Sequence, residues 1–139
     1  MSKDESLFTQ KQFIDAINRN ELDRLHNIVS ANVIDHDPVK GQIPGAQGYI
    51  RFFSRLHKAF PDLRIEIEQM VADDDDSVGF VYTLTGTHLG EYQMITPVGS
   101  RIQVRGMQVC RYENGKIAER WGKWDETGIL RQLGVAVEV

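Results

Sequence analysis

The sequence has only one cysteine, Cys110, and it has no run of about 18 apolar residues. A single cysteine excludes a disulfide within the chain, and the missing apolar run argues against a membrane-spanning helix. The first ten residues, MSKDESLFTQ, also lack the apolar core of a signal peptide. We therefore expect a cytoplasmic protein that does not use a membrane as a partner.

A surplus of basic residues is also missing. Lysine and arginine total 16 while aspartate and glutamate total 20, which gives a formal net charge of −4. Proteins that bind nucleic acid usually show the opposite balance, so we expect no nucleic-acid partner. The one acidic block, Asp73–Asp76, lies between two strand-like stretches and is too short for an acidic tail. It predicts a solvated hairpin loop.

Motifs for metals, nucleotides and nucleophiles are absent as well. No H-x-H, H-E-x-x-H or C-x-x-C spacing occurs, so the sequence predicts no metal site. The glycines of GQIPGAQG, residues 41–48, follow no predicted strand and lack the Lys-Ser/Thr ending of a phosphate-binding loop. We therefore expect no cofactor. Cys110 lies in the strand-like sequence VCRY, which predicts a structural thiol.

Helical spacing dominates the first 60 of the 139 residues, a length that suits a single domain over residues 1–139. It predicts helices over residues 6–19, over a short stretch from Leu22 to Val29, and from Ile50 to Phe60. Pro61 ends the third helix because proline disfavours helical geometry in the residue before it. Residues 33–48, VIDHDPVKGQIPGAQG, are rich in glycine and proline and are expected to be largely loop.

After Pro61 the apolar residues recur with a period of two. This alternation predicts antiparallel strands over residues 63–68, 78–88, 102–112 and 117–125, with ENGK at 113–116 as a hairpin turn. A short helix over residues 127–133 follows. Helices followed by strands predict the α+β class, with a curved antiparallel sheet wrapped around the N-terminal helices. Such a cone-shaped sheet can hold a ligand in its mouth.

Alternation also sorts the polar side chains by face. His88 shares the even-numbered face of Phe80, Tyr82 and Leu84, which places its imidazole on the core side. A core histidine hydrogen-bonded to backbone is an equal alternative to a site residue. Gln108 lies within an apolar even-numbered set, so its amide needs a partner, which is either a ligand or a neighbouring backbone group.

The last strand has two possible orientations, and these decide the role of Asp125. If Ile117 and Trp121 are core residues, Asp125 points into the cavity. If Ala118 and Trp124 are core residues instead, Asp125 faces outward and caps the following helix. The pattern alone leaves both orientations open.

Six landmarks follow one another along the chain: HDP (36–38), the Gly-rich loop and helix ending in AFPDL (59–63), GTHLGEY (86–92), TPVGSRIQVRG (96–106), RYENGKIAERW (111–121) and DETGILRQLG (125–134). In this order they resemble the SnoaL-like polyketide cyclase family of the nuclear transport factor 2-like, or cystatin-like, fold. The resemblance covers roughly residues 6–134. It implies a cone with a deep apolar pocket, usually in a homodimer or a pair of dimers. In characterised members an aspartate acts as acid and base in an intramolecular aldol ring closure, without metal or cofactor.

The family pattern assigns roles to individual residues. Asp125 matches the aspartate of the family's W-x-x-x-D-x-x-G-L-L-x-Q-L-G run, with Trp121 as its tryptophan, and this match favours the pocket orientation of Asp125. His36 and His88 match recurrent pocket histidines. We therefore predict Asp125 and His88 as catalytic residues. The predicted substrate-binding residues are His36, Gln108, Trp121, Phe53, Phe60, Tyr82 and Tyr92.

The resemblance implies an acid/base enzyme that closes a ring on a hydrophobic, polyketide-like small molecule. One departure from the family keeps alternatives open, because Gln108 stands where many members have histidine. Glutamine donates hydrogen bonds but does not carry a proton at neutral pH. The alternatives are an isomerase, a dehydratase or an epoxide hydrolase on the same fold, or a small-molecule-binding domain without catalysis.

Overall fold

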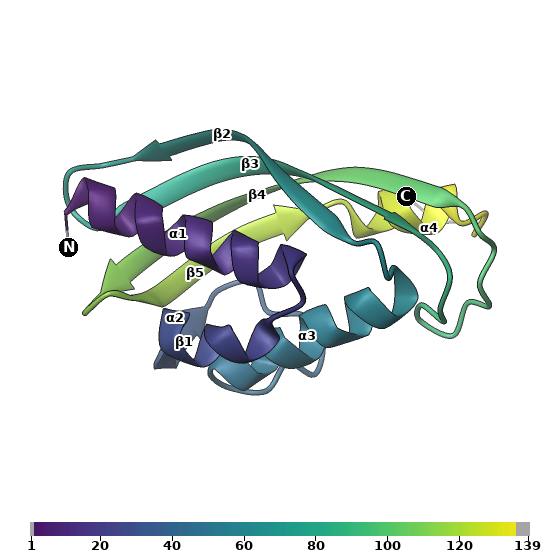
Figure 1. Ribbon diagram of the computed structural model, residues 1–139, viewed down its shortest axis with the longest axis horizontal. Helices are drawn as coiled ribbons and strands as arrows, with labels where there is room; N and C mark the ends of the chain where they lie inside the picture. The colour runs from purple at the N-terminus through teal and green to yellow at the C-terminus, as the bar shows by residue number, and fades with distance from the viewer. Residues whose placement is uncertain (1, 136–139) are drawn as a thin grey trace.

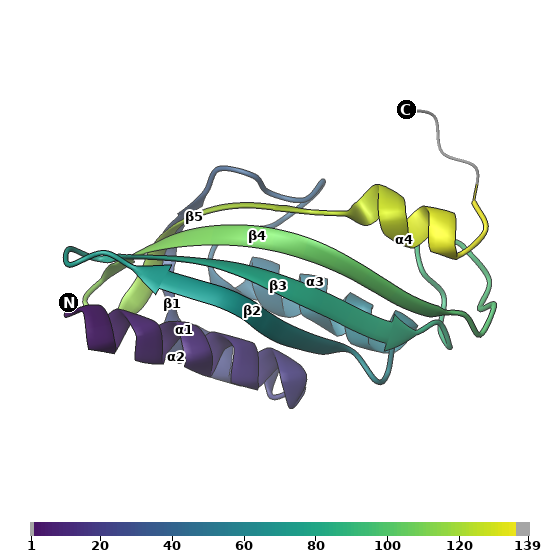
Figure 2. The same cartoon turned by 90° about the horizontal axis from the view of Figure 1, so that it is seen from above.

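The computed structural model describes residues 2–135 and has the predicted α+β architecture. Its five strands form one curved sheet in the order β1-β5-β4-β3-β2 that does not close into a barrel. The sheet arches over helices α1 and α3, and α4 lies at one end of it (Figures 1 and 2). In chain order the elements are α1 (Lys3–Asn18), a 3₁₀ turn (Leu22–Arg24), α2 (Leu25–Ile28), β1 (Val29–Asp35), α3 (Ala46–Ala59), β2 (Arg64–Ala72), β3 (Ser77–Thr87), β4 (Arg101–Glu113), β5 (Lys116–Trp124) and α4 (Glu126–Gln132).

Local chemistry explains where the two long helices begin and end. Ser2 caps α1 by accepting a hydrogen bond from the Glu5 backbone N–H at 3.2 Å, and acidic residues in the first turn suit the helix dipole. Gly45, with φ of 73°, precedes α3, and Phe60 ends that helix before Pro61. No helix within residues 2–135 is long and apolar enough to cross a membrane.

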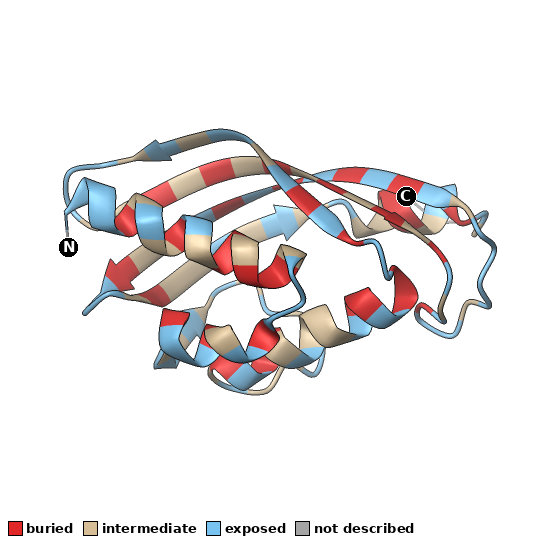
Figure 3. Cartoon of the chain, viewed as in Figure 1, coloured by how far each residue is buried: buried red, intermediate tan, exposed pale blue. Residues whose placement is uncertain are grey.

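Strands β3 and β4 follow the predicted alternation closely. Their pairing runs without a register shift from Ser77↔Arg111 to Thr87↔Arg101, and the even-numbered residues are buried against the helices (Figure 3). The acidic block Asp73–Asp76 forms the loop between β2 and β3, as predicted. There the Asp73 carboxylate accepts three backbone N–H bonds, from residues 75, 76 and 77.

A bulge in β5 decides the orientation that the sequence left open. Arg111 pairs with Glu119, but Tyr112 pairs with Ile117, so Ala118 is an extra residue on the β5 side. Ile117 and Ala118 are therefore both buried, and beyond them the even-numbered residues face the core. The inward-facing residues of β5 that follow Ala118 are Arg120, Gly122 and Trp124.

Strand β1 differs from the sequence expectation, because its residues precede proline and glycine and their local pattern predicts a helix end followed by a loop. It pairs in parallel with β5, with Asp35 opposite Arg120, and it continues this contact through a hydrogen bond from the His36 backbone N–H to the Arg120 carbonyl at 2.9 Å. This edge strand brings residues 35–37 beside the inward face of β5, where the polar site forms.

Candidate functional site

An aromatic-lined cavity of about 60 Å³ lies between the helices and the inner face of the sheet. Such a volume holds a few water molecules and is far smaller than the roughly 300–1,000 Å³ of typical ligand sites. A bulky ligand therefore has to displace side chains to enter. The lining residues are Phe13, Ile14, Ile17, Asp35, Asp37, Val39, Gln42, Tyr49, Phe52, Phe53, Leu56, Ile65, Phe80, Tyr82, Leu84, Gln108, Arg120, Gly122 and Trp124.

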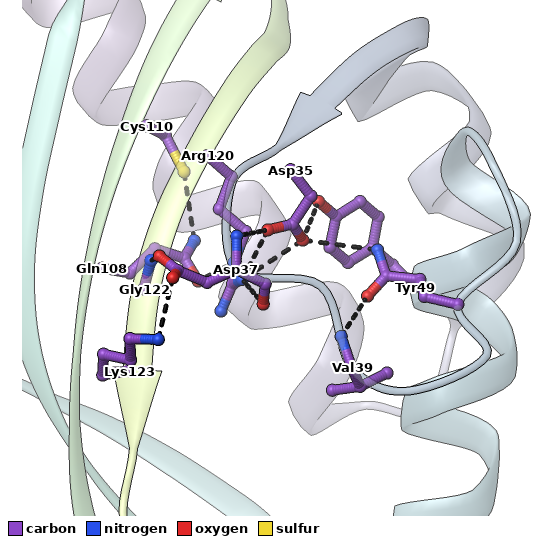
Figure 4. A network of polar contacts seen from close by, with 10 residues as sticks. Asp35, Asp37, Val39, Tyr49, Gln108, Cys110, Arg120, Gly122 and Lys123 are labelled. Atoms are coloured by element: carbon purple, nitrogen blue, oxygen red, sulfur yellow. Dashed lines mark hydrogen bonds and ion pairs between the residues drawn. The ribbon is translucent and has the colours of Figure 1, made fainter.

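An ion pair between Asp35 and Arg120 forms the polar side of this cavity (Figure 4). The Arg120 Nη1 lies 3.1 Å from Oδ1 and 3.2 Å from Oδ2 of Asp35, and only 17% and 6% of the two side chains, respectively, are exposed. A pair with so little exposed side-chain surface is costly to break, because removing one partner leaves the other charge without compensation. The pair arises because β1 and β5 place these residues opposite each other on the inner face.

The Asp35 carboxylate is saturated with hydrogen bonds. Besides Arg120, it accepts bonds from the Tyr49 hydroxyl at 2.7 Å, the Asp37 backbone N–H at 2.9 Å and the Gln42 side-chain amide at 3.3 Å. Burial alone would raise the pKa of Asp35, but the Tyr49 hydrogen bond and the Arg120 charge outweigh it, and the pKa lies below its ordinary value. Asp35 therefore holds Arg120 and Tyr49 in place and has little capacity to take up a proton.

Asp37 lies two residues further along the chain and also lines the cavity, with 24% of its side chain exposed. Its Oδ1 accepts from Lys123 Nζ at 2.8 Å, and its Oδ2 accepts from the Gly122 backbone N–H at 3.0 Å. These two contacts, the Lys123 hydrogen bond first, lower the pKa of Asp37. They occupy about half of the four lone-pair positions of a carboxylate. Asp37 thus retains acceptor capacity that Asp35 lacks.

Arg120 and Tyr82 present donors that the protein itself does not use. Arg120 Nε donates to Gln108 Oε1 at 2.9 Å, but within residues 2–135 neither its Nη2 group nor the Tyr82 hydroxyl makes a hydrogen bond. Two glycines make room for these groups. A Cβ at Gly106 would lie 2.3 Å from the Tyr82 hydroxyl oxygen, and one at Gly122 would lie 2.7 Å from Arg120 Nη2.

Burial raises the pKa of Tyr82 more than the nearby charge of Arg120 lowers it, so Tyr82 remains a neutral donor at neutral pH. The amide of Gln108 also donates to Cys110 Sγ at 3.1 Å, and burial raises the pKa of Cys110 to about 12. That thiol stays protonated and structural.

Asp125 lies outside the cavity, so the predicted orientation into the pocket is wrong. Its Oδ1 accepts the Gly128 backbone N–H at 2.8 Å, which makes Asp125 the N-cap of α4, and its side chain is exposed. It borders a shallow hollow with Arg105 and Met107, on the outer face of the sheet. The bulge at Ala118 is the physical reason, because it turns the odd-numbered residues of β5 outward.

His36 and Trp121 also face away from the cavity. The two rings stack on each other with centroids 4.6 Å apart, and His36 Nε2 lies 2.6 Å from Glu119 Oε2. Trp121 is 38% exposed, and neither residue lines the cavity. The outward orientation of Trp121 follows from the same bulge. The outward orientation of His36 follows from strand β1, because alternation along β1 and its continuation turns residues 35 and 37 inward and residue 36 outward.

His88, Phe60 and Tyr92 are buried but pack beside the cavity instead of lining it. His88 is on the core side as alternation predicted, yet its Nδ1 accepts the Val98 backbone N–H at 3.3 Å and its ring lies 5.6 Å from that of Phe60. This geometry matches the alternative of a core histidine. Tyr92 contacts Phe60 with centroids 5.4 Å apart and lines an outer hollow described below.

Phe53, Tyr82 and Gln108 do line the cavity, on the faces that helical spacing and alternation predicted. Four polar residues that accompany them were not predicted, namely Asp35, Asp37, Tyr49 and Arg120. Asp35 and Asp37 carried a signal, because two acids at i and i+2 share one face of an extended strand. Arg120 carried none, because its orientation depends on the bulge.

Comparison with known proteins gives one family and many similar folds. The family model described as SnoaL-like polyketide cyclase matches residues 8–133. TsrD from Streptomyces laurentii superposes with a TM-score of 0.87 at 21% identity, covering 98% of this chain and 99% of that one. AclR, a proposed hydroxylase from Streptomyces galilaeus, gives 0.85 at 25% identity over 99% and 90%.

A SnoaL-like polyketide cyclase from Agrobacterium tumefaciens gives a TM-score of 0.73 at 26% identity, covering 91% of this chain and 95% of that one. No curated protein sequence matches the chain.

Proposed function

The chain belongs to the family of SnoaL-like polyketide cyclases, and we propose that it catalyses intramolecular aldol ring closure on a hydrophobic poly-carbonyl molecule without a cofactor. The observation that supports this proposal best is the buried Arg120 guanidinium, held by Asp35 and Gln108 with one amino group unused, at the side of an aromatic cavity. A fixed cation in an apolar site stabilises negative charge that develops on an oxygen.

The polar residues would divide the reaction between them. Asp37 would take a proton from a carbon beside a carbonyl, and the resulting enolate oxygen would receive hydrogen bonds from Arg120 Nη2 and the Tyr82 hydroxyl. Asp35 orients Arg120, and Gly106 and Gly122 leave room for the Tyr82 hydroxyl and for Arg120 Nη2. Little reorganisation is therefore needed as charge develops. Asp35 and Tyr49 would act as positioning residues for Arg120.

The bond changes balance within a single substrate molecule. The enolate carbon attacks a second carbonyl carbon of the same molecule, forming one carbon–carbon bond while that carbonyl oxygen becomes an alkoxide. The alkoxide then takes the proton held by Asp37, so the product is an isomer of the substrate. The aromatic walls, including Phe53 and Phe80, would fold the chain into the reactive pose.

Binding without catalysis is the second candidate function, and one observation favours it. No histidine of residues 2–135 lines the cavity, and both aspartates there have lowered pKa values, which makes them weaker bases. Only substrates with an acidified C–H, such as carbons between two carbonyls, would be deprotonated by such a carboxylate.

Hydrogen–deuterium exchange separates these two candidates. In D₂O, we expect the protein to accelerate exchange of the central C–H of an aryl 1,3-diketone bound in the cavity, because Asp37 removes that proton. The exchange rate is read by NMR against buffer alone at the same pH. A diketone that binds, as shown by line broadening, but exchanges at the buffer rate would contradict catalysis and leave a binding protein.

We also propose that the chain forms a homodimer through the outer face of the sheet. Val109 lies opposite Trp121 in the register, and four apolar side chains there are 38–63% exposed, namely Val71, Met107, Val109 and Trp121. Apolar residues gathered on one sheet face are typical of an interaction surface. Light scattering after size exclusion should return twice the chain mass of 15.9 kDa, and Val109→Lys should return a monomer. A monomeric wild type would contradict the proposal.

A further inference from the structure

We infer that the ligand of this cavity carries an acidic group, which binds in a second, outer hollow rimmed by Lys40, Arg55 and Lys58. This inference rests on the proposed ligand-binding role of the cavity and adds the substrate class, an apolar ring system bearing an anionic group. The outer hollow is about 430 Å³, much larger than the inner cavity.

The two spaces share a wall of four apolar residues. Val39, Phe52, Leu56 and Trp124 line both the inner cavity and the outer hollow. The rings of Phe52 and Trp124 meet edge to face with centroids 5.6 Å apart. Since the inner cavity is too small for a ring system as it stands, a ligand that enters from the outer hollow has to part these two rings. Its trailing end then remains in the outer hollow.

The net charge of the residues that line the outer hollow is positive, whereas the net charge of the whole chain is negative. Three cations line it, Lys40 from the loop before α3 and Arg55 and Lys58 from one side of α3, whereas the chain carries a net −4. All three are exposed, and within residues 2–135 none of their side chains makes an ion pair or a hydrogen bond. They are therefore available to an anionic group of a ligand.

Two carboxylates also line the hollow, Glu91 from the loop after β3 and Glu126 from the start of α4. Glu126 is engaged, because Gln93 Nε2 donates to it and the Tyr92 hydroxyl lies 3.5 Å away. Glu91 is exposed in the loop after β3. Three cations and two carboxylates leave a balance of +1, with the positive charge concentrated along α3. This arrangement orients an amphipathic acid with its ring inward and its charge towards α3.

Two dyes of nearly the same shape test the inference. 8-Anilinonaphthalene-1-sulfonate and N-phenyl-1-naphthylamine share the same ring system, and only the first carries an anionic group. Each exposed ion pair is worth about 1.5- to 5-fold in affinity, so we expect the sulfonate to bind about tenfold more tightly than the neutral dye.

A tryptophan variant reports where the dye enters. Trp121→Phe leaves Trp124 as the only tryptophan, so quenching of Trp124 fluorescence reports entry of the dye between Phe52 and Trp124.

The decisive variant replaces Lys40, Arg55 and Lys58 together by glutamine. It should remove the preference for the sulfonate while leaving the neutral dye's affinity unchanged, which also shows that the variant is folded. The matched control, Lys3, Lys11 and Arg64 to glutamine, changes the net charge equally at positions that do not line the outer hollow and should keep the preference.

Equal affinity for the two dyes in the wild type, or a preference that survives the triple replacement, would overturn the inference and leave the cavity intact. Binding of neither dye would overturn the ligand-binding cavity itself, and the proposed function with it. The two failures are therefore distinguishable.

Discussion

Replacing Arg120 by methionine should lower the free energy of unfolding by about 3 kcal/mol, because it leaves the Asp35 carboxylate buried without its counter-charge. For a domain of this size that corresponds to a fall in Tm of roughly 10 °C. Chemical denaturation followed by circular dichroism measures the change. The pKa of Asp35 should rise in the variant, since the Arg120 charge no longer lowers it and only the hydrogen bonds, that of Tyr49 first, still oppose burial.

The pH dependence and a second variant check that cause. In the wild type, the stability that comes from the lowered pKa of Asp35 is fully present at pH values above the ordinary pKa of aspartate. It is lost as the pH falls through the lowered pKa of the folded state. The penalty of Arg120→Met should shrink at acid pH, where Asp35 becomes neutral. The double variant Asp35→Asn/Arg120→Met should recover most of the loss. A double variant that shows the sum of two independent losses would contradict a coupled pair.

Replacing Asp37 by asparagine should reduce ring closure and C–H exchange by about 10²–10⁴-fold, the range typical of removing a general base. The fold should survive, because asparagine can still accept the Gly122 N–H through its carbonyl oxygen. Affinity for a non-reacting diketone analogue, measured by fluorescence, should change little. Loss of binding together with loss of rate would mean that Asp37 holds the ligand instead of moving the proton.

The pH profile gives a further readout of the same residue. Because Lys123 and the Gly122 N–H lower the pKa of Asp37, the carboxylate form persists below the ordinary aspartate value of about 3.9. Activity should stay constant as the pH is lowered to about 3.9, and it should decline as the pH falls further through the lowered pKa of Asp37. Lys123→Met should move the decline to higher pH, by a small amount because Lys123 is 84% exposed and its charge is screened.

The fold was predictable because its patterns are local and unbroken. Alternation in β3 and β4 placed Tyr82 and Gln108 on the inner face correctly, since eleven consecutive pairs link the two strands without a shift. Helical spacing likewise placed Phe53 towards the core. In these segments each residue's orientation follows from its neighbours, and no distant contact changes it.

The site was only partly predictable because two non-local features build it. One extra residue at Ala118 reverses the faces of β5, which sends Arg120 and Trp124 inward and Asp125 outward. No turn residue or glycine marks that position in the sequence. The family's sequence pattern reinforced the wrong orientation, since it identified Asp125 by its place in the chain and not by the side its carboxylate faces.

Strand β1 is the second feature. Its pairing with β5 is parallel and brings together residues 85 positions apart, Asp35 and Arg120. The strand has one paired edge and precedes proline and glycine, so its local sequence resembles a loop. The sequence thus predicted Phe53, Tyr82 and Gln108 correctly as cavity residues, whereas the charged residues depend on pairing that only the folded chain shows.

We propose that the reactive carboxylate is that of Asp37 in the cavity and not that of Asp125 at the start of α4. The deciding experiment compares C–H exchange of the bound diketone in Asp37→Asn and in Asp125→Asn. Both changes replace one carboxylate by its amide, and asparagine caps helices as well as aspartate does. We predict loss of exchange in Asp37→Asn and wild-type exchange in Asp125→Asn. Wild-type exchange in Asp37→Asn with loss in Asp125→Asn would instead identify Asp125 as the base.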